Sequence, residues 1–143
     1  MRMYRLAAIL FLAIFLSIAG CERSTRQPTY PVKGRVLVDG KPAQDLFIYL
    51  HPIDKNDAKA VRPFAQTNEN GEFELNSYVT GDGAPVGEFM VTFDWPMKSG
   101  IFKNKFEGPD QLRGKYKQPD KSKFRINITK QGQLLETFEL STK

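Results

Sequence analysis

The chain has 143 residues, 41% hydrophobic and 26% charged, with a formal net charge of +5. Its length favours one domain rather than two. One cysteine excludes an internal disulfide, one histidine excludes a histidine-rich metal site, and no apolar run reaches the roughly 18 residues of a spanning helix. No cofactor or metal is expected.

The first twenty residues have the pattern of a secretory signal, because Arg2 and Arg5 precede an apolar segment over residues 7–19. Residues 18–21, Ile-Ala-Gly-Cys, resemble the bacterial lipobox. This resemblance implies cleavage between Gly20 and Cys21, a diacylglyceryl thioether on Cys21, and acylation of the new amine. Several acyl chains, at about 0.8 kcal/mol per buried methylene, make such attachment effectively permanent. An ordinary cleaved signal or an uncleaved anchor are the alternatives.

Residues 21–30 are polar and without periodicity after Cys21, which indicates a flexible tether. Glu22 follows the cysteine, and by resemblance to enterobacterial sorting a residue other than Asp there favours the outer membrane. We therefore expect a protein anchored in the bacterial envelope, facing the periplasm or the exterior. The folded domain is predicted over residues 31–143.

Alternating apolar and polar residues predict short strands separated by turn signals such as Asp39-Gly40 and Asn70-Gly71. The predicted strands cover residues 31–38, 45–51, 61–67, a return from Phe73, 86–95, 123–129 and 134–140. Seven short strands with no convincing helix after the signal indicate an all-β fold, a seven-stranded antiparallel Greek-key sandwich. Val36, Ile48, Phe73, Val91 and Phe124 are expected in the core.

Three segments resemble a known family in combination. They are Val-Lys-Gly-Arg-Val at 32–36 with the Asp-Gly-Lys-Pro turn at 39–42, Thr-Asn-Glu-Asn-Gly-Glu-Phe at 67–73, and residues 83–91. Together they look like a carboxypeptidase regulatory-like domain, a transthyretin-like (prealbumin-type) sandwich. Asn68 stands where the family usually has Asp, and Phe89 where Tyr is common. The resemblance implies an accessory or binding module, with Thr67 and Phe73 facing the core.

Residues 96–122 form a long basic segment, predicted as a loop. Eight cations between residues 98 and 123 face three anions. Lys103, Lys105, Lys115 and Lys117 are the candidate contacts for an envelope protein, an anionic lipid or a polysaccharide. Nucleic acid is not expected because the chain is predicted to be exported. A solvated loop is the alternative.

Phe47 and Tyr49 are predicted on an outward strand face, where aromatic rings can stack on sugars or contact protein. The alternative is that the loop over 96–122 folds over them. His51, on the same face, is expected to be structural. No serine has a G-x-S-x-G setting and the acidic loops lack EF-hand spacing. We expect a non-catalytic binding or structural module; a carbohydrate-binding module is the alternative, and a small hydrolase the least favoured.

Overall fold

The computed structural model describes residues 26–54, 60–98 and 105–143. The fold within these ranges is an all-β sandwich, as predicted, and it includes one 3-10 turn in the described residues, η2 (Pro119–Lys121). No helix in the described ranges has the length and hydropathy to cross a membrane. The strands are β1 (Thr29–Tyr30), β2 (Val32–Val38), β3 (Lys41–Pro42), β4 (Phe47–Pro52), β5 (Phe64–Gln66), β6 (Glu72–Glu74), β7 (Ala84–Pro85), β8 (Gly87–Asp94), β9 (Arg125–Ile128), β10 (Gln133–Leu134) and β11 (Phe138–Leu140).

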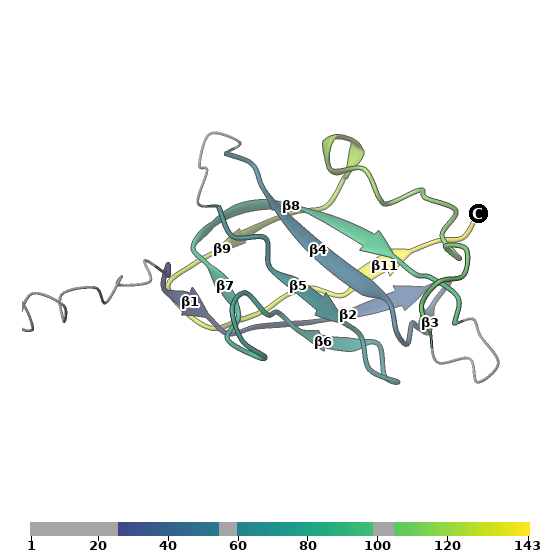
Figure 1. Cartoon of the computed structure of the whole chain (residues 1–143), viewed down its shortest axis with the longest axis horizontal. Coiled ribbons are helices and arrows are strands. Elements are labelled where there is room, and N and C mark those ends of the chain that lie inside the picture. The colour runs from purple at the N-terminus through teal and green to yellow at the C-terminus, as the bar shows by residue number, and fades with distance from the viewer. Residues whose placement is uncertain (1–25, 55–59, 99–104) are drawn as a thin grey trace, which may run out of the picture.

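One layer of the sandwich is the antiparallel sheet β5-β4-β8-β9, which runs from β8 and β9 near the top of Figure 1 to β5 at its centre. Buried and outward side chains alternate along its strands, as the alternation of apolar and polar residues in the sequence predicts. Ile48 on β4 and its partner Phe93 on β8 are fully buried, whereas Phe47 and Tyr49 point to the other face. The sheet therefore has one core face and one outer face.

The second layer is built around β2, which pairs antiparallel with β3 and β6 and parallel with β10 and β11. The prediction of a purely antiparallel sandwich is therefore wrong for this layer, which contains two parallel pairings. The single strand expected over residues 134–140 is also divided in two. Leu134 lies opposite Lys33 and Phe138 opposite Val36, so four residue steps oppose three. This bulge reverses the side-chain alternation, leaving Leu134 exposed and Phe138 buried.

The last residues of the predicted tether belong to the folded domain. Thr29 and Tyr30 form β1 and pair with β7, and the Gln27 N–H donates to the Tyr78 hydroxyl at 3.0 Å. Residues 29 and 30, which the sequence assigns to the tether, thus pair with the sandwich. Gly83, with φ +84°, permits this approach, because a Cβ there would overlap the Tyr30 carbonyl.

The two layers enclose an aromatic cluster centred on Phe93. Its ring meets those of Phe124 and Phe138 edge to face at 5.3 and 5.2 Å, and Phe73 stacks on Phe138 at 6.2 Å. Of the five residues predicted as core, four are buried and the fifth, Phe124, is half-buried. Thr67 also faces the core, where its hydroxyl donates to the Ala43 carbonyl at 2.5 Å.

The docking of β1 can be tested at Gly83. Gly83→Ala should destabilise the domain by several kcal/mol, because the methyl group must displace the Tyr30 carbonyl as well as occupy a left-handed φ. Gly114→Ala is the matched control: its φ is +73° but nothing lies within 4 Å of its Cβ position, so about 1 kcal/mol is expected. Urea unfolding measures both. Equal losses would show that residue 30 does not pack against Gly83.

Candidate binding surfaces

Aromatic side chains occupy the outer face of the sheet β5-β4-β8-β9. Phe47 and Tyr49 lie side by side on β4, with ring centroids 6.4 Å apart and planes inclined by 16°. Phe64 is the cross-strand partner of Tyr49, and the two residues are 46% and 38% exposed. Adjacent aromatic rings that are exposed to water are unfavourable unless a partner covers them, so such a face is typical of a contact surface.

The segment predicted as loop 96–122 is fixed to the sandwich in its described part. Asp110 organises it: Oδ1 accepts the backbone N–H groups of Trp95 and Leu112 at 2.9 and 3.0 Å, and Oδ2 accepts that of Gly114 at 2.7 Å. Leu112 is fully buried. One carboxylate thus joins the end of β8 to the turn that follows it.

Beyond this turn the segment runs along β8. The N–H of Phe93 donates to the Tyr116 carbonyl at 3.0 Å, and the Ser122 hydroxyl donates to the Val91 carbonyl at 2.5 Å. The Tyr116 ring meets Phe93 edge to face. The described part, residues 105–123, is therefore held as a ridge, which we call the basic ridge, at the upper right of Figure 1.

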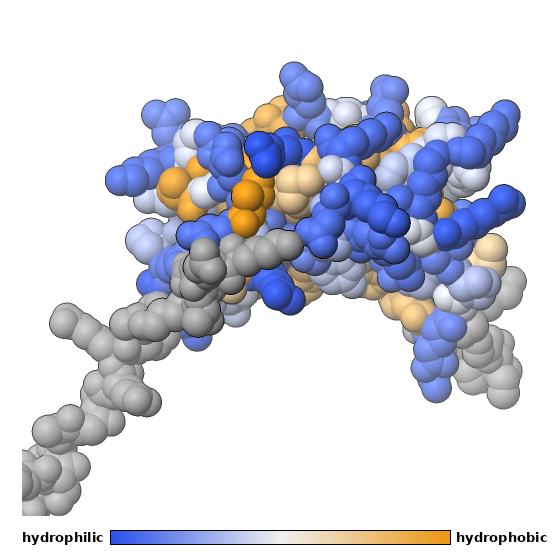
Figure 2. All heavy atoms as spheres, turned by 90° about the horizontal axis from the view of Figure 1, so that it is seen from above, coloured by the Kyte–Doolittle hydropathy of each residue, from blue (hydrophilic) through white to orange (hydrophobic). Residues whose placement is uncertain are grey.

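The basic ridge presents six exposed cations: Lys105, Arg113, Lys115, Lys117, Lys121 and Lys123. Hydrophilic side chains cover much of the half of the molecule that carries it, to the right in Figure 2. Lys117 pairs with Asp94 at 3.0 Å, Lys105 lies 3.8 Å from Glu107, and Lys115 donates to the Lys143 carbonyl at 2.5 Å. The contact with Asp94 raises the pKa of Lys117 above its ordinary value, so this ammonium stays charged.

Phe106 of the same segment packs edge-on against Phe47, with centroids 5.2 Å apart. Lys98, which pairs with Asp45 at 2.6 Å, lies over the Phe106 ring. The long segment therefore covers Phe47 through Phe106, which was the alternative to an open aromatic face. Tyr49 stays more open, and burial raises the pKa of its hydroxyl.

His51 lies on the same outer face, where it contacts a neighbouring strand. Its Nε2 is 2.8 Å from the hydroxyl of Thr92, which is itself buried. Burial, with the nearby Arg62, lowers the pKa of His51 below its ordinary value. The imidazole is therefore neutral at pH 7, and its short contact is with a hydroxyl rather than a carboxylate.

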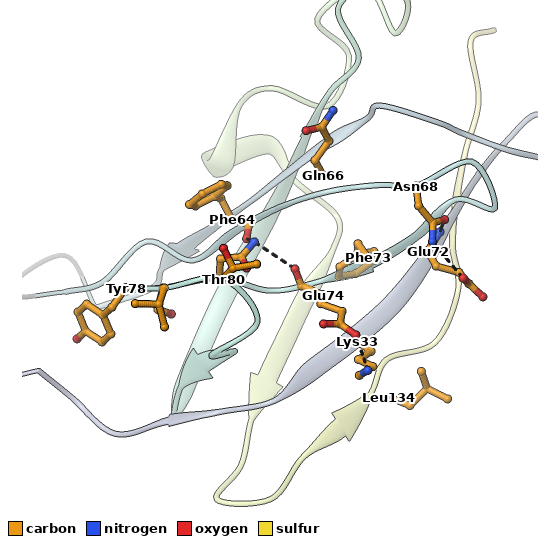
Figure 3. A pocket seen from close by; sticks show the side chains of 13 residues that line it. Lys33, Phe64, Gln66, Asn68, Glu72, Phe73, Glu74, Tyr78, Thr80 and Leu134 are labelled. Carbon is orange, nitrogen blue, oxygen red and sulfur yellow. Dashed lines mark hydrogen bonds and ion pairs between the residues drawn. The ribbon is translucent and has the colours of Figure 1, made fainter.

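A second feature, a trough of about 850 Å³, lies on the outer surface where the two layers join (Figure 3). The backbone groups of Phe64 and Asn76 bond each other at 2.9 and 2.8 Å and link β5 to β6. Lys33 on β2 lies between Glu74 on β6, with which it forms an ion pair, and Leu134 on β10. Figure 3 shows the Phe64 and Tyr78 rings at one side of the trough and Leu134 at the other.

One wall of the trough is the turn after β6, and Asp82 holds it. Its carboxylate accepts the backbone N–H groups of Ser77, Tyr78 and Val79 at 2.7 to 3.2 Å. Burial opposes the charge, but these hydrogen bonds prevail and lower the pKa of Asp82. Sequence reasoning missed the trough, because its residues come from four segments and each reads as an ordinary strand surface or turn.

The predicted site residues divide into three groups. Phe47 and Tyr49 lie on the outer face near Lys117. Lys117 pairs with Asp94, which is the cross-strand partner of Phe47. Lys105 and Lys115 lie further along the basic ridge. Gly20, Cys21 and Lys103 lie outside the described residues.

Comparison with known proteins gives no matching family model and no matching curated protein. Solved structures with a similar fold include the following two. A DUF3823 family protein from Parabacteroides merdae has 12% identity and a TM-score of 0.38, with 81% of this chain and 46% of that one covered. A 9R-lipoxygenase from Cyanothece has 15% identity and a TM-score of 0.42, with 79% and 16% covered. The chain spans less than half the length of either.

The role of Asp82 can be tested by acid. Because its folded-state pKa is lowered, Asp82 stabilises the fold above the ordinary carboxyl pKa, and this contribution disappears as pH falls through the folded value. Asp82→Asn should therefore lower the free energy of unfolding by about 2 kcal/mol at pH 7 and by much less near pH 2. Urea unfolding across this range measures the difference; a constant loss would assign it to packing instead.

Proposed function

We propose that this chain is a bacterial envelope lipoprotein, anchored through Cys21, whose sandwich is a non-catalytic binding module of the transthyretin-like type. The observation that carries the binding role is the basic ridge. A solvated loop would not need the Asp110 carboxylate, the buried Leu112 and the Tyr116 ring to fix it against β8. The fixed segment presents its cations together beside the outer aromatic face.

An anionic component of the envelope fits this surface best, as a headgroup, polymer or acidic protein face. Charge complementarity attracts such a partner, and the half-exposed Tyr49 adds an apolar contact beside the ridge. Stacking of sugars on Phe47 and Tyr49 is the second candidate, supported by the small angle between the two rings. The Phe106 edge on Phe47 favours the anionic partner over it.

The docked tether would keep the sandwich close to the bilayer. Arg26 lies over the Tyr78 ring at 5.3 Å, so the chain already contacts the sandwich at residue 26. Arg26 is five residue steps after Cys21, and five fully extended steps span at most about 17 Å.

The anchor is tested by Cys21→Ser in the full chain. This change removes the thiol that would carry the diacylglyceryl group, so metabolic labelling with a fatty acid should be lost and uncleaved or misrouted precursor should accumulate. Mass spectrometry of the N-terminal peptide measures the modification. An unmodified Cys21 in wild-type mature protein would remove the anchor from the proposal.

The ridge is tested by Lys105→Gln with Lys115→Gln, measured as retention of non-acylated protein on vesicles rich in anionic lipid and on anionic envelope polysaccharide. Each cation near an anionic surface contributes about 1 kcal/mol, so the loss of two should lower the affinity by about 30-fold and make it depend less on salt. Lys41→Gln with Lys130→Gln removes two exposed cations elsewhere and should change little. Equal retention of both double variants would exclude the ridge as the contact surface.

A further inference from the structure

The trough in Figure 3 combines apolar surface with polar side chains in a way that the basic ridge does not. Phe64, Val79 and Leu134 at its borders are 46%, 58% and 83% exposed. Carboxylate, amide and ammonium groups lie between these apolar residues. Exposed apolar side chains that border one hollow, rather than standing singly, indicate a contact site.

The backbone of the trough cannot accept a peptide strand. β6 pairs with β2 on one side and meets β5 on the other through the Phe64–Asn76 bridge, so β6 has no open edge along which a further strand could pair. Recognition must therefore come from side chains. This excludes strand addition from a protein partner in the trough itself.

The polar side chains keep donors and acceptors for a ligand after their internal contacts are made. The Lys33 ammonium has three protons and pairs with Glu74. The Glu72 carboxylate accepts from Asn68 at 3.2 Å and has further lone pairs, and Gln66 donates to Asp45 at 2.9 Å while its carbonyl oxygen can still accept. Hydroxyl groups, which both donate and accept, match such a mixture.

The charge of the trough argues against an anionic ligand. Lys33 and Glu74 compensate each other, and Glu72 adds a further carboxylate to the lining. A polyanion would meet like charge here, in contrast to the basic ridge. An uncharged ligand with an apolar ring face and a rim of hydroxyls satisfies all three features.

We propose that the trough binds an uncharged saccharide chain, with a sugar ring stacked on Phe64 and hydroxyls bonded to Glu72 and Lys33. The trough is distinct from the basic ridge and needs no lipid on Cys21, so this site goes beyond the proposed function. It moves the saccharide role from Phe47, which Phe106 covers, to Phe64, the exposed cross-strand neighbour of Tyr49.

The test is titration of the full-length chain, purified in detergent, with neutral gluco-, xylo-, manno- and chito-oligosaccharides and with an oligogalacturonate as the anionic probe. At least one neutral series should bind and the anionic probe should not bind in the trough. Phe64→Ala should weaken neutral binding by about tenfold, and Phe64→Tyr, which keeps the ring, should stay within about threefold. Val86→Ala removes an equally exposed apolar side chain outside the trough and should have no effect.

Two further variants separate binding from folding. Leu134 is 83% exposed and Glu72 lies at the surface, so Leu134→Asp and Glu72→Gln should fold normally and still weaken binding. Absence of binding to every neutral series would overturn the proposal, as would binding that Phe64→Ala and Glu72→Gln leave unchanged. Binding of the anionic probe alone, lost in the double variant at Lys105 and Lys115, would support the ridge and overturn the trough.

Discussion

The contact of Phe93 with aromatic rings from both layers is the interaction on which the rest of the structure depends. Phe93 lies on β8, yet its ring meets Phe138 from the second layer and Phe124 next to β9. Edge-to-face geometry lets these bulky rings fill the narrow space between sheets without voids. Tyr116 joins the same cluster from the basic ridge, so the packing that closes the core also positions the surface with the proposed anionic partner.

A second constraint is the bulge between β10 and β11. In a regular strand Leu134 and Phe138, four residues apart, would point to the same face, and either the core would lose a phenyl ring or a leucine would have to enter it. With the bulge, Phe138 completes the aromatic cluster while Leu134 is left at the border of the trough. One local irregularity therefore serves both the core and the candidate saccharide site.

The two candidate surfaces have opposite electrostatic character on one small domain. The ridge gathers cations on a segment whose backbone Asp110 holds in place, whereas the trough compensates its one ammonium with Glu74 and keeps a second carboxylate, Glu72. The segment before β2 also lies close to the trough. β1 pairs with β7, and Gln27 contacts Tyr78, which lines the trough. A ligand in the trough would thus lie beside the segment that leads to the proposed anchor.

The sequence by itself determined the all-β class, most strand positions and the core face of each long strand, because period-two alternation and turn residues act locally. Val36, Ile48 and Val91 were predicted as core and are buried, and Gly40 and Gly71, predicted in turns, have positive φ. Tertiary structure alone decided the parallel pairing of β10 and β11 with β2, the docking of residues 29–30, the order of the basic ridge and the trough. Each of these depends on which distant segments meet, as when Lys33 pairs with Glu74, and alternation along one strand carries no information about its neighbour.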